Sequence, residues 1–177
     1  MRRLWPVILL AVLVGTGFGA TWWFLKSPQY ALYQIGKAIH DHDPRLFLAY
    51  VDLDKVMDSQ KEELARLLLP HQSKEAQDTV SRILGAVMGA LRGQIHQRVA
   101  QMVADTERNN IPSAWALVAA AHVTRNGEYA LVVLSNPEKG QRLRMGMRRD
   151  PEQGHWRVVE IDPRDLRRLV QELLEKS

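Results

Sequence analysis

The sequence predicts an α+β protein with an N-terminal transmembrane helix, a helical first half, a four-stranded antiparallel sheet and a C-terminal amphipathic helix. Three observations lead to this prediction. Residues 4–25 are apolar and carry no charge. From residue 30 to 105, apolar side chains recur with the 3.6-residue period of a helix. From residue 114 to 162, short apolar or alternating segments are separated by turn sequences, which is typical of a meander of strands.

The first segment is long enough to cross a membrane. Leu4–Leu25 contains 22 residues. As an α-helix this length spans about 33 Å, against a hydrocarbon core of about 30 Å. Arg2 and Arg3 precede the segment and Lys26 follows it. This excess of positive charge predicts that the N-terminus lies in the cytoplasm and the rest of the chain outside the cell membrane.

The segment divides the chain into an anchor and a domain. We expect residues 1–26 to be a single-pass signal anchor and residues 27–177 to be an extracytoplasmic domain, with 27–110 helical, 114–162 forming the sheet and 163–176 the closing helix. The alternative is a signal peptide cleaved near Gly17 or Gly19, which would leave a secreted or periplasmic protein. The chain stays apolar through Leu25, which favours the uncleaved anchor.

Composition excludes several functional classes. The net charge is +4, and Arg2 and Arg3 supply half of it, so the predicted domain is too weakly basic to indicate a nucleic-acid partner. The absence of cysteine excludes disulfides, thiolate catalysis and thiolate metal sites. No nucleophile elbow, zinc-protease motif, phosphate-binding loop or dinucleotide fingerprint is present. The sequence therefore assigns no catalytic residue, no cofactor and no metal ligand.

Capping residues divide the helical half. Tyr30–His40 has a helical period, and Asp43 followed by Pro44 is a typical start of a second, short helix. Asp52 or Asp54 is expected to cap the segment that follows. Ser59–Glu62 fits a capping box before the next apolar run.

This helical part resembles a known family. The resemblance rests on Tyr30–Ile39, then Asp43, then Phe47–Asp52. These residues look like an uncharacterised bacterial family with one N-terminal membrane segment, an alanine-rich helix, an Asp, an aromatic residue and then Tyr-Val-Asp. The resemblance implies a membrane-anchored domain and no known activity. More loosely, the same helices resemble the opening of nuclear-transport-factor-like α+β domains.

Residues 40–43 alternate imidazoles with carboxylates. His40, Asp41, His42 and Asp43 are all of types that bind metal ions well. Asp43 is better explained as the cap of the next helix, and charged residues at helix ends are usually solvated. The sequence therefore favours a helix corner over a metal site at this position.

A long helix is predicted from a cap at Ser73 to about residue 105. Gly85, Gly89 and Gly93 recur in it every fourth residue, and each costs a helix about 1 kcal/mol relative to alanine. One interpretation is close contact with a protein partner or with a second copy. The other, which we favour, is a bend or packing on the first helix of the same chain. The apolar stripe of this helix consists of Ala76, Val80, Ile83, Leu84, Val87, Met88, Leu91, Ile95, Val99 and Met102.

Four strands and their turns follow. Trp115–Thr124 is the first predicted strand, Asn126-Gly127 is a strong hairpin signal, and Tyr129–Leu134 is the second strand. The third is Arg142–Arg149 and the fourth is His155–Asp162. Alternation along the third strand places Leu143, Met145 and Met147 on one face and Arg142, Arg144 and Arg148 on the other.

The arginine row has two interpretations. It suits an anion or acidic lipid headgroups, or it is the solvated face of the sheet. In the register that starts at the turn after the third strand, Arg144 lies opposite Glu160 and Arg148 opposite Trp156. These positions predict an ion pair and a cation–π contact. We expect such internal partners to explain the row.

The chain ends in a predicted amphipathic helix that begins at Asp162-Pro163. Its apolar face would lie on a membrane or, as we expect, on the domain or a partner. That face consists of Leu166, Leu169, Val170, Leu173 and Leu174.

Two classes of function lead, and a purely structural or oligomerising role in the envelope is the third. The first is a membrane-anchored bacterial envelope protein that binds a small apolar ligand or a protein partner without catalysis. The second is a small hydrolase or isomerase with its site in the concavity of the sheet, using His122, Tyr129 and Asp43. The absence of catalytic motifs favours the first class, and His122 is expected to be a core histidine because its strand is apolar.

Overall fold

The computed structural model describes residues 22–68, 74–106, 113–136, 140–165 and 167–168. The predicted anchor up to Thr21, the predicted cap at Ser73 and the whole predicted apolar face of the C-terminal helix lie outside these residues. Within the described ranges, no helix is both long and apolar enough to cross a bilayer.

Helices precede the sheet along the chain, and the four strands form one antiparallel sheet in the order β1-β2-β3-β4. The helical first half and the antiparallel meander are thus confirmed. The helices are α2 (Pro28–His40), α3 (Pro44–Tyr50), α4 (Leu53–Leu68), α5 (Lys74–Asp105) and α6 (Ala114–Ala119). The strands are β1 (Ala121–Asn126), β2 (Tyr129–Asn136), β3 (Gln141–Arg149) and β4 (Trp156–Ile161).

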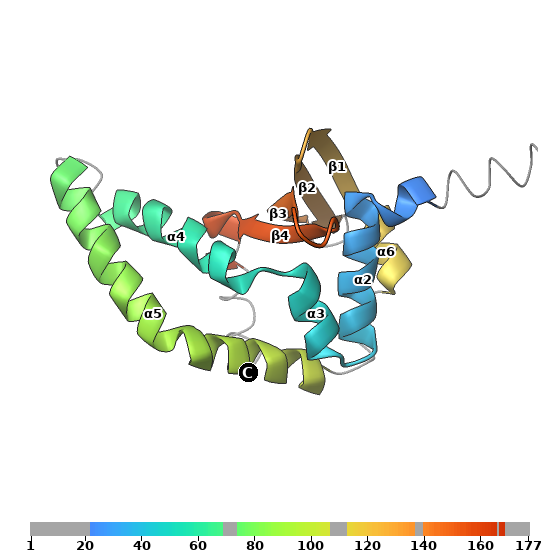
Figure 1. The fold of residues 1–177 in the computed structure, drawn as a ribbon, viewed down its shortest axis with the longest axis horizontal. Coiled ribbons are helices and arrows are strands. Elements are labelled where there is room, and N and C mark those ends of the chain that lie inside the picture. The colour runs from blue at the N-terminus through green and yellow to red at the C-terminus, as the bar shows by residue number, and fades with distance from the viewer. Residues whose placement is uncertain (1–21, 69–73, 107–112, 137–139, 166, 169–177) are drawn as a thin grey trace, which may run out of the picture.

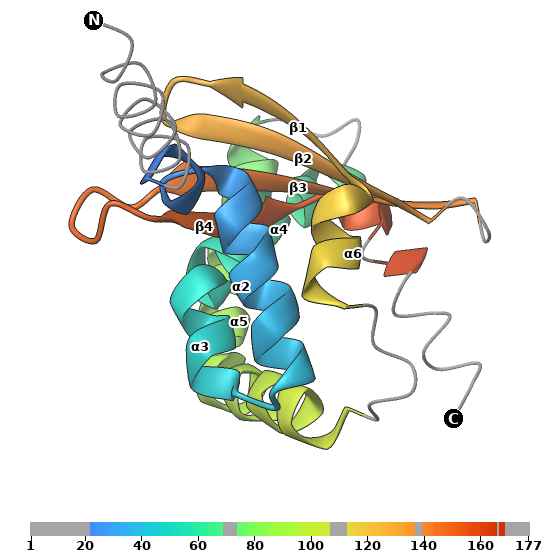
Figure 2. The same cartoon turned by 90° about the vertical axis from the view of Figure 1, so that its right-hand side faces the viewer.

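The helices gather on one face of the sheet. Figure 2 shows α2, α3 and α5 on the same side of the strands. Figure 1 shows α5 as a long arc on the outside of the molecule, with α4 between part of this arc and β4. Helix α4 contacts both of these elements. One long side of α5 is therefore left without a neighbouring element in the described part of the chain.

The core lies between the sheet and α2, α3 and α4. Its largest fully buried side chains come from the strands: Trp156, Met147, Val132 and Val158. These residues share one face because successive residues of a strand point to opposite sides. Leu32 of α2 is 2% exposed and joins them. Burying one large apolar side chain stabilises the fold by about 1.5–3 kcal/mol.

Two predicted element boundaries are wrong. The segment expected to open the first strand forms α6, because Ser113 caps a helix by accepting a hydrogen bond from the Ala116 N–H at 3.2 Å and alanine favours helices. Ser59 lies inside α4 instead of starting a helix. Asp52 supplies the cap of α4 by accepting a hydrogen bond from the Lys55 N–H at 3.1 Å.

The predicted pairing of the last two strands is also wrong. Arg149 pairs with Trp156, not with His155, and a bulge at Gly146 shifts the register again so that Gly146 lies opposite Glu160. A shift of one residue exchanges the neighbours of every side chain on the strand. The partners of the arginine row therefore differ from those predicted.

Candidate functional site

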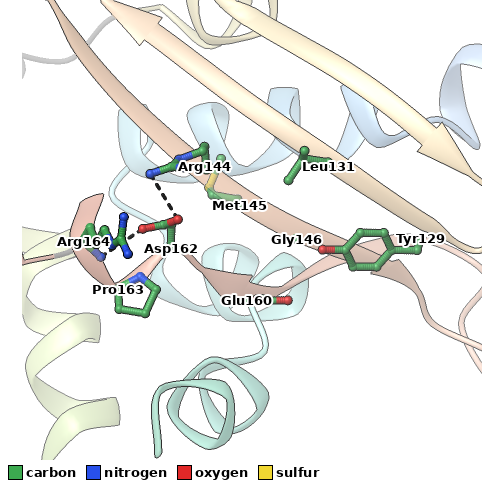
Figure 3. A pocket seen from close by; sticks show the side chains of 9 residues that line it. All are labelled: Tyr129, Leu131, Arg144, Met145, Gly146, Glu160, Asp162, Pro163 and Arg164. Carbon is green, nitrogen blue, oxygen red and sulfur yellow. Dashed lines mark hydrogen bonds and ion pairs between the residues drawn. The ribbon is translucent and has the colours of Figure 1, made fainter. Parts of the chain in front are cut away.

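The open face of the sheet carries a hollow of about 480 Å³. Except for Met145, which belongs to the core, its strand residues alternate with the core residues, so it lies on the side of the sheet away from the core. Figure 3 shows its lining residues, which come from β2, β3, β4 and the start of the C-terminal helical turn. They are Tyr129, Leu131, Arg144, Met145, Gly146, Glu160, Asp162, Pro163 and Arg164.

The charge of Arg144, in the wall of this hollow, is balanced by carboxylates of the same chain. Arg144 donates from Nε to Asp165 Oδ2 at 2.9 Å and from its backbone N–H to the same oxygen at 3.0 Å. Its Nη2 lies 3.1 Å from Asp162 Oδ2. The hydrogen bonds from Arg144 lower the pKa of Asp165, whose side chain is 4% exposed. The guanidinium therefore holds the C-terminal helical turn against β3, and its two carboxylate partners would repel an anion at this position.

A tyrosine crosses the floor of the hollow. A Cβ added at Gly146 would lie 2.5 Å from Tyr129 Oη, so the phenol lies directly over this glycine. Partial burial raises the pKa of Tyr129, and its interaction with the Glu160 carboxylate raises it further. A phenol with a raised pKa stays protonated at neutral pH and is a poor base.

The three residues considered for catalysis do not converge. Tyr129 lies in the hollow. His122 is exposed on β1, not buried as expected, and pairs with Val133, four residues along β2 from Tyr129 and so about 13 Å away. Asp43 lies in the α2–α3 corner, where its Oδ1 accepts hydrogen bonds from two backbone N–H groups of α3 at 3.0 Å each. The predicted role of Asp43 as a helix cap is confirmed.

The alternation of histidine and aspartate at residues 40–43 forms a helix corner. The described residues contain no group of three or more His, Asp and Glu side chains placed to hold a metal ion. The backbone of His42 adopts the left-handed conformation, with φ 56°, and its N–H donates to the Ile39 carbonyl at 3.3 Å. The Asp43 N–H reaches the Ala38 carbonyl at 2.8 Å. These two bonds form a Schellman motif that ends α2.

The rest of the arginine row lies in solvent or finds other partners than those predicted. Arg142 and Arg148 are exposed, and Arg148 lies opposite Arg157 on β4. The cation–π contact with Trp156 is made by Arg125 of β1 instead, at 5.2 Å from the ring centroid. Because the register differs from the predicted one, Arg148 lies opposite Arg157 instead of Trp156.

The surface of α5 offers a second candidate site. Three large apolar side chains of this helix lie one turn apart on its surface: Ile83 is 59% exposed, Val87 51% and Leu91 42%. The sequence predicted a single apolar stripe on α5. In the structure Leu84 and Met88 of that stripe are half-buried, whereas Ile83 and Val87 are exposed. The helix therefore has two apolar faces, of which one points to solvent.

The solvent side of α5 is free of charged residues over about five turns. We call this set the outer stripe; Arg82 and Arg98 lie at its edges. A helical-wheel projection of the sequence already contains this signal, but only the structure shows which side is exposed. The outer stripe consists of Ile83, Ala86, Val87, Ala90, Gln94, Gln97 and Gln101, all exposed.

The glycines of α5 do not share one environment. A Cβ at Gly85 would lie 3.8 Å from Lys61 Nζ, so this glycine faces α4 of the same chain. A Cβ added at Gly89 or at Gly93 would have no atom within 4 Å among the described residues beyond its neighbours in the helix. The Gly85 position thus fits the intramolecular interpretation, and the other two border open surface.

Residues 18–106, about half of the chain, match the family model described as "Protein of unknown function (DUF2939)". The chain belongs to this family. This confirms the resemblance to an uncharacterised family, whose description names no activity. The matched DUF2939 segment contains α2 to α5 and ends before the sheet begins.

The Tyr-Val-Asp pattern of the DUF2939 segment is structural. The Tyr50 ring packs 4.8 Å from the ring of His155, and Val51 forms an isolated bridge with Val158. Asp52 then caps α4. The pattern therefore docks the α3–α4 corner of DUF2939 on the edge of β4.

Comparison of this DUF2939 chain with curated proteins and with solved structures found no match. The looser resemblance to nuclear-transport-factor-like domains stays a prediction.

Proposed function

We propose that the chain is a single-pass membrane protein whose extracytoplasmic domain is a non-catalytic protein-interaction module. The anchor is supported by the length of the uncharged segment Leu4–Leu25 and by the arginines before it. The sheet face toward the helices is filled by Trp156 and Met147, so a protein partner fits the domain better than an apolar ligand between these layers.

The observation that carries this proposal is the outer stripe of α5. Charged residues normally cover the solvent face of a surface helix. Here exposed Ile83 and Val87 are followed by alanine and glutamine and by no charge. Exposed apolar surface of this kind is typical of a protein interface.

The partner proposed for the outer stripe is a second copy of the chain. Near the axis of a twofold interface, each residue meets the equivalent residue of the other copy. An uncharged stripe avoids the repulsion that like charges would cause there. Ala86 and Ala90 allow two helices to approach closely. A shared membrane anchor would confine both copies to one plane and so raise their effective concentration.

The experiment is native mass spectrometry of the full chain released from detergent micelles. We expect a dimer, and Val87→Glu should shift it to monomer because the new charge would face its own copy. Leu131→Glu is the matched control, since Leu131 is 42% exposed against 51% for Val87 but lies on the sheet; it should stay dimeric. A monomeric parent chain, or equal effects of the two variants, would refute self-association through α5.

The anchor is tested separately. A C-terminal alkaline phosphatase fusion, which is active only outside the cytoplasm, should be active and should stay in the membrane after carbonate extraction. Release of a shortened chain into the soluble fraction would favour the cleaved signal peptide instead.

A further inference from the structure

The chain leaves the predicted anchor through a rigid corner. Residues 22–25 form a helical turn, and Ser27, which is 4% exposed, joins this turn to α2. Ser27 Oγ donates to the Phe24 carbonyl at 2.6 Å and accepts from the Tyr30 N–H at 3.2 Å. Trp156 donates from Nε1 to the Lys26 carbonyl at 2.9 Å. The direction in which the chain leaves the domain is therefore fixed by the core.

Aromatic rings connect this corner to α6. Trp115 stacks on Phe24 with a centroid distance of 5.9 Å and lies 4.8 Å from the ring of Tyr33. Tyr30 contacts both Phe24 at 5.8 Å and Tyr33 at 6.3 Å. Figure 1 shows the turn at residues 22–25 and α6 on the same side of α2. A residue about 90 positions later in the chain is thus held beside the end of the anchor.

The rings at this end of the molecule are exposed to an unusual degree. Trp22 is 64% exposed, Trp23 68% and Trp115 59%. Lys26 Nζ lies 4.5 Å from the centroid of Trp22. Exposed tryptophans are costly in water and favourable at the headgroup level of a bilayer, where lysine accompanies them. The short helix that carries Trp115 contains no charge, so nothing opposes its approach to that layer.

We infer that Trp115 is a second contact with the bilayer interface, which sets the domain at a fixed orientation on the membrane instead of letting it swing from its anchor. The inference rests on the proposed anchor. Its physical basis is continuity: Trp22 and Trp23 end the apolar segment, and the stack of Phe24 on Trp115 extends the same aromatic surface onto α6.

The absence of cysteine makes single spin labels unique, so label depth tests this inference. The full chain carries Val87→Glu, so that no second copy covers α5, and is inserted in vesicles of phosphatidylcholine and phosphatidylglycerol. It is labelled in turn at Leu13→Cys in the anchor, Ala116→Cys on α6 and Gln97→Cys on α5. Collision with an aqueous nickel complex is measured by power-saturation EPR. We expect collision rates several-fold lower at positions 13 and 116 than at position 97.

Variants of Trp115 then assign the contact. In the Ala116→Cys chain, Trp115→Ala should raise nickel collision to the level of position 97, whereas Trp115→Tyr, which keeps an interfacial ring, should not. Leu131→Ala, an exposed apolar side chain on the sheet, should have no effect. As a control for folding, Trp115→Ala is also made in the Gln97→Cys chain. The EPR line shape of the label at position 97 should not change, which would show that the fold is intact.

The outcomes separate the two proposals. If position 13 is protected but position 116 is as accessible as position 97, the second contact does not exist and the anchor stands. If Trp115→Ala leaves position 116 protected, Trp115 is not the contact. If position 13 itself is accessible to nickel, the anchor fails and the inference fails with it.

Discussion

Trp156 of β4, the largest fully buried side chain, donates its indole N–H to the backbone carbonyl of Lys26, 130 residues earlier in the chain. The core of the sheet thus ends at the point where the chain emerges from the predicted anchor. In a loosely tethered domain this junction would be a linker. Here it is a buried corner, and Ser27 beside it is 4% exposed.

Trp156→Phe should lower the free energy of unfolding by about 1–3 kcal/mol, because it removes this hydrogen bond and part of a filled core position. Urea denaturation of the detergent-solubilised chain measures the change. Trp115→Phe, at an exposed site, should change it by less than about 0.5 kcal/mol. Equal effects at the two tryptophans would contradict the assignment of Trp156 as a filled, hydrogen-bonded core position.

Gly146→Ala should destabilise the chain by about 1–3 kcal/mol, since the new Cβ would lie 2.5 Å from Tyr129 Oη. In a Tyr129→Phe background the cost should fall by about 1 kcal/mol because the clashing oxygen is gone. A double-mutant cycle of unfolding free energies measures this coupling. Additive effects would show that the phenol does not lie over the glycine.

His42→Gly should stabilise the chain by about 0.5–1 kcal/mol, because only glycine adopts the left-handed conformation of this residue without cost. Within the described residues His42 Nδ1 is buried and has no hydrogen-bond partner, so no bond from it is lost. His42→Ala keeps the strain and should bring no gain. A loss of stability in His42→Gly would instead assign this side chain a structural role.

Asp165→Asn should lower stability by about 1–3 kcal/mol at neutral pH, because it removes a carboxylate that accepts hydrogen bonds from Arg144. Arg144 lowers the pKa of Asp165 in the folded chain. The stabilisation is therefore complete above the unfolded value of about 4 and is lost as the pH falls through the lower folded value. The gap between parent and variant should close in acid.

Unfolding midpoints at several pH values measure this gap. Asp58→Asn, whose carboxylate is 53% exposed and pairs with Lys61, is the control and should show little change at any pH. A gap for Asp165→Asn that is independent of pH would contradict the assignment.

Local signals predicted much of the fold. Asp43-Pro44 started a helix and Asn126-Gly127 formed the hairpin, with Gly127 at φ 60°. Such signals act through bonds between residues only a few positions apart, so the sequence contains all the participants. The family was also visible in the sequence, because its pattern of Tyr50, Val51 and Asp52 is contiguous.

The candidate sites were less predictable. His122 was expected in the core because its strand is apolar, but it lies on the open face of the sheet, whereas its neighbours Ala121 and Val123 pack against the core. The partner of Arg144 was expected on β4 and proved to be Asp165, beyond the end of that strand. Both outcomes depend on which segments meet across the sheet, and no short pattern specifies that.

The sequence by itself determined the uncharged N-terminal segment, the positions of caps and turns, and the order of helices before strands. Only the tertiary structure decided that a bulge at Gly146 shifts the last strand pair and which face of α5 remains open. The reason is physical. Backbone preference is a property of neighbouring residues, whereas burial and register follow from contacts between segments that are distant along the chain.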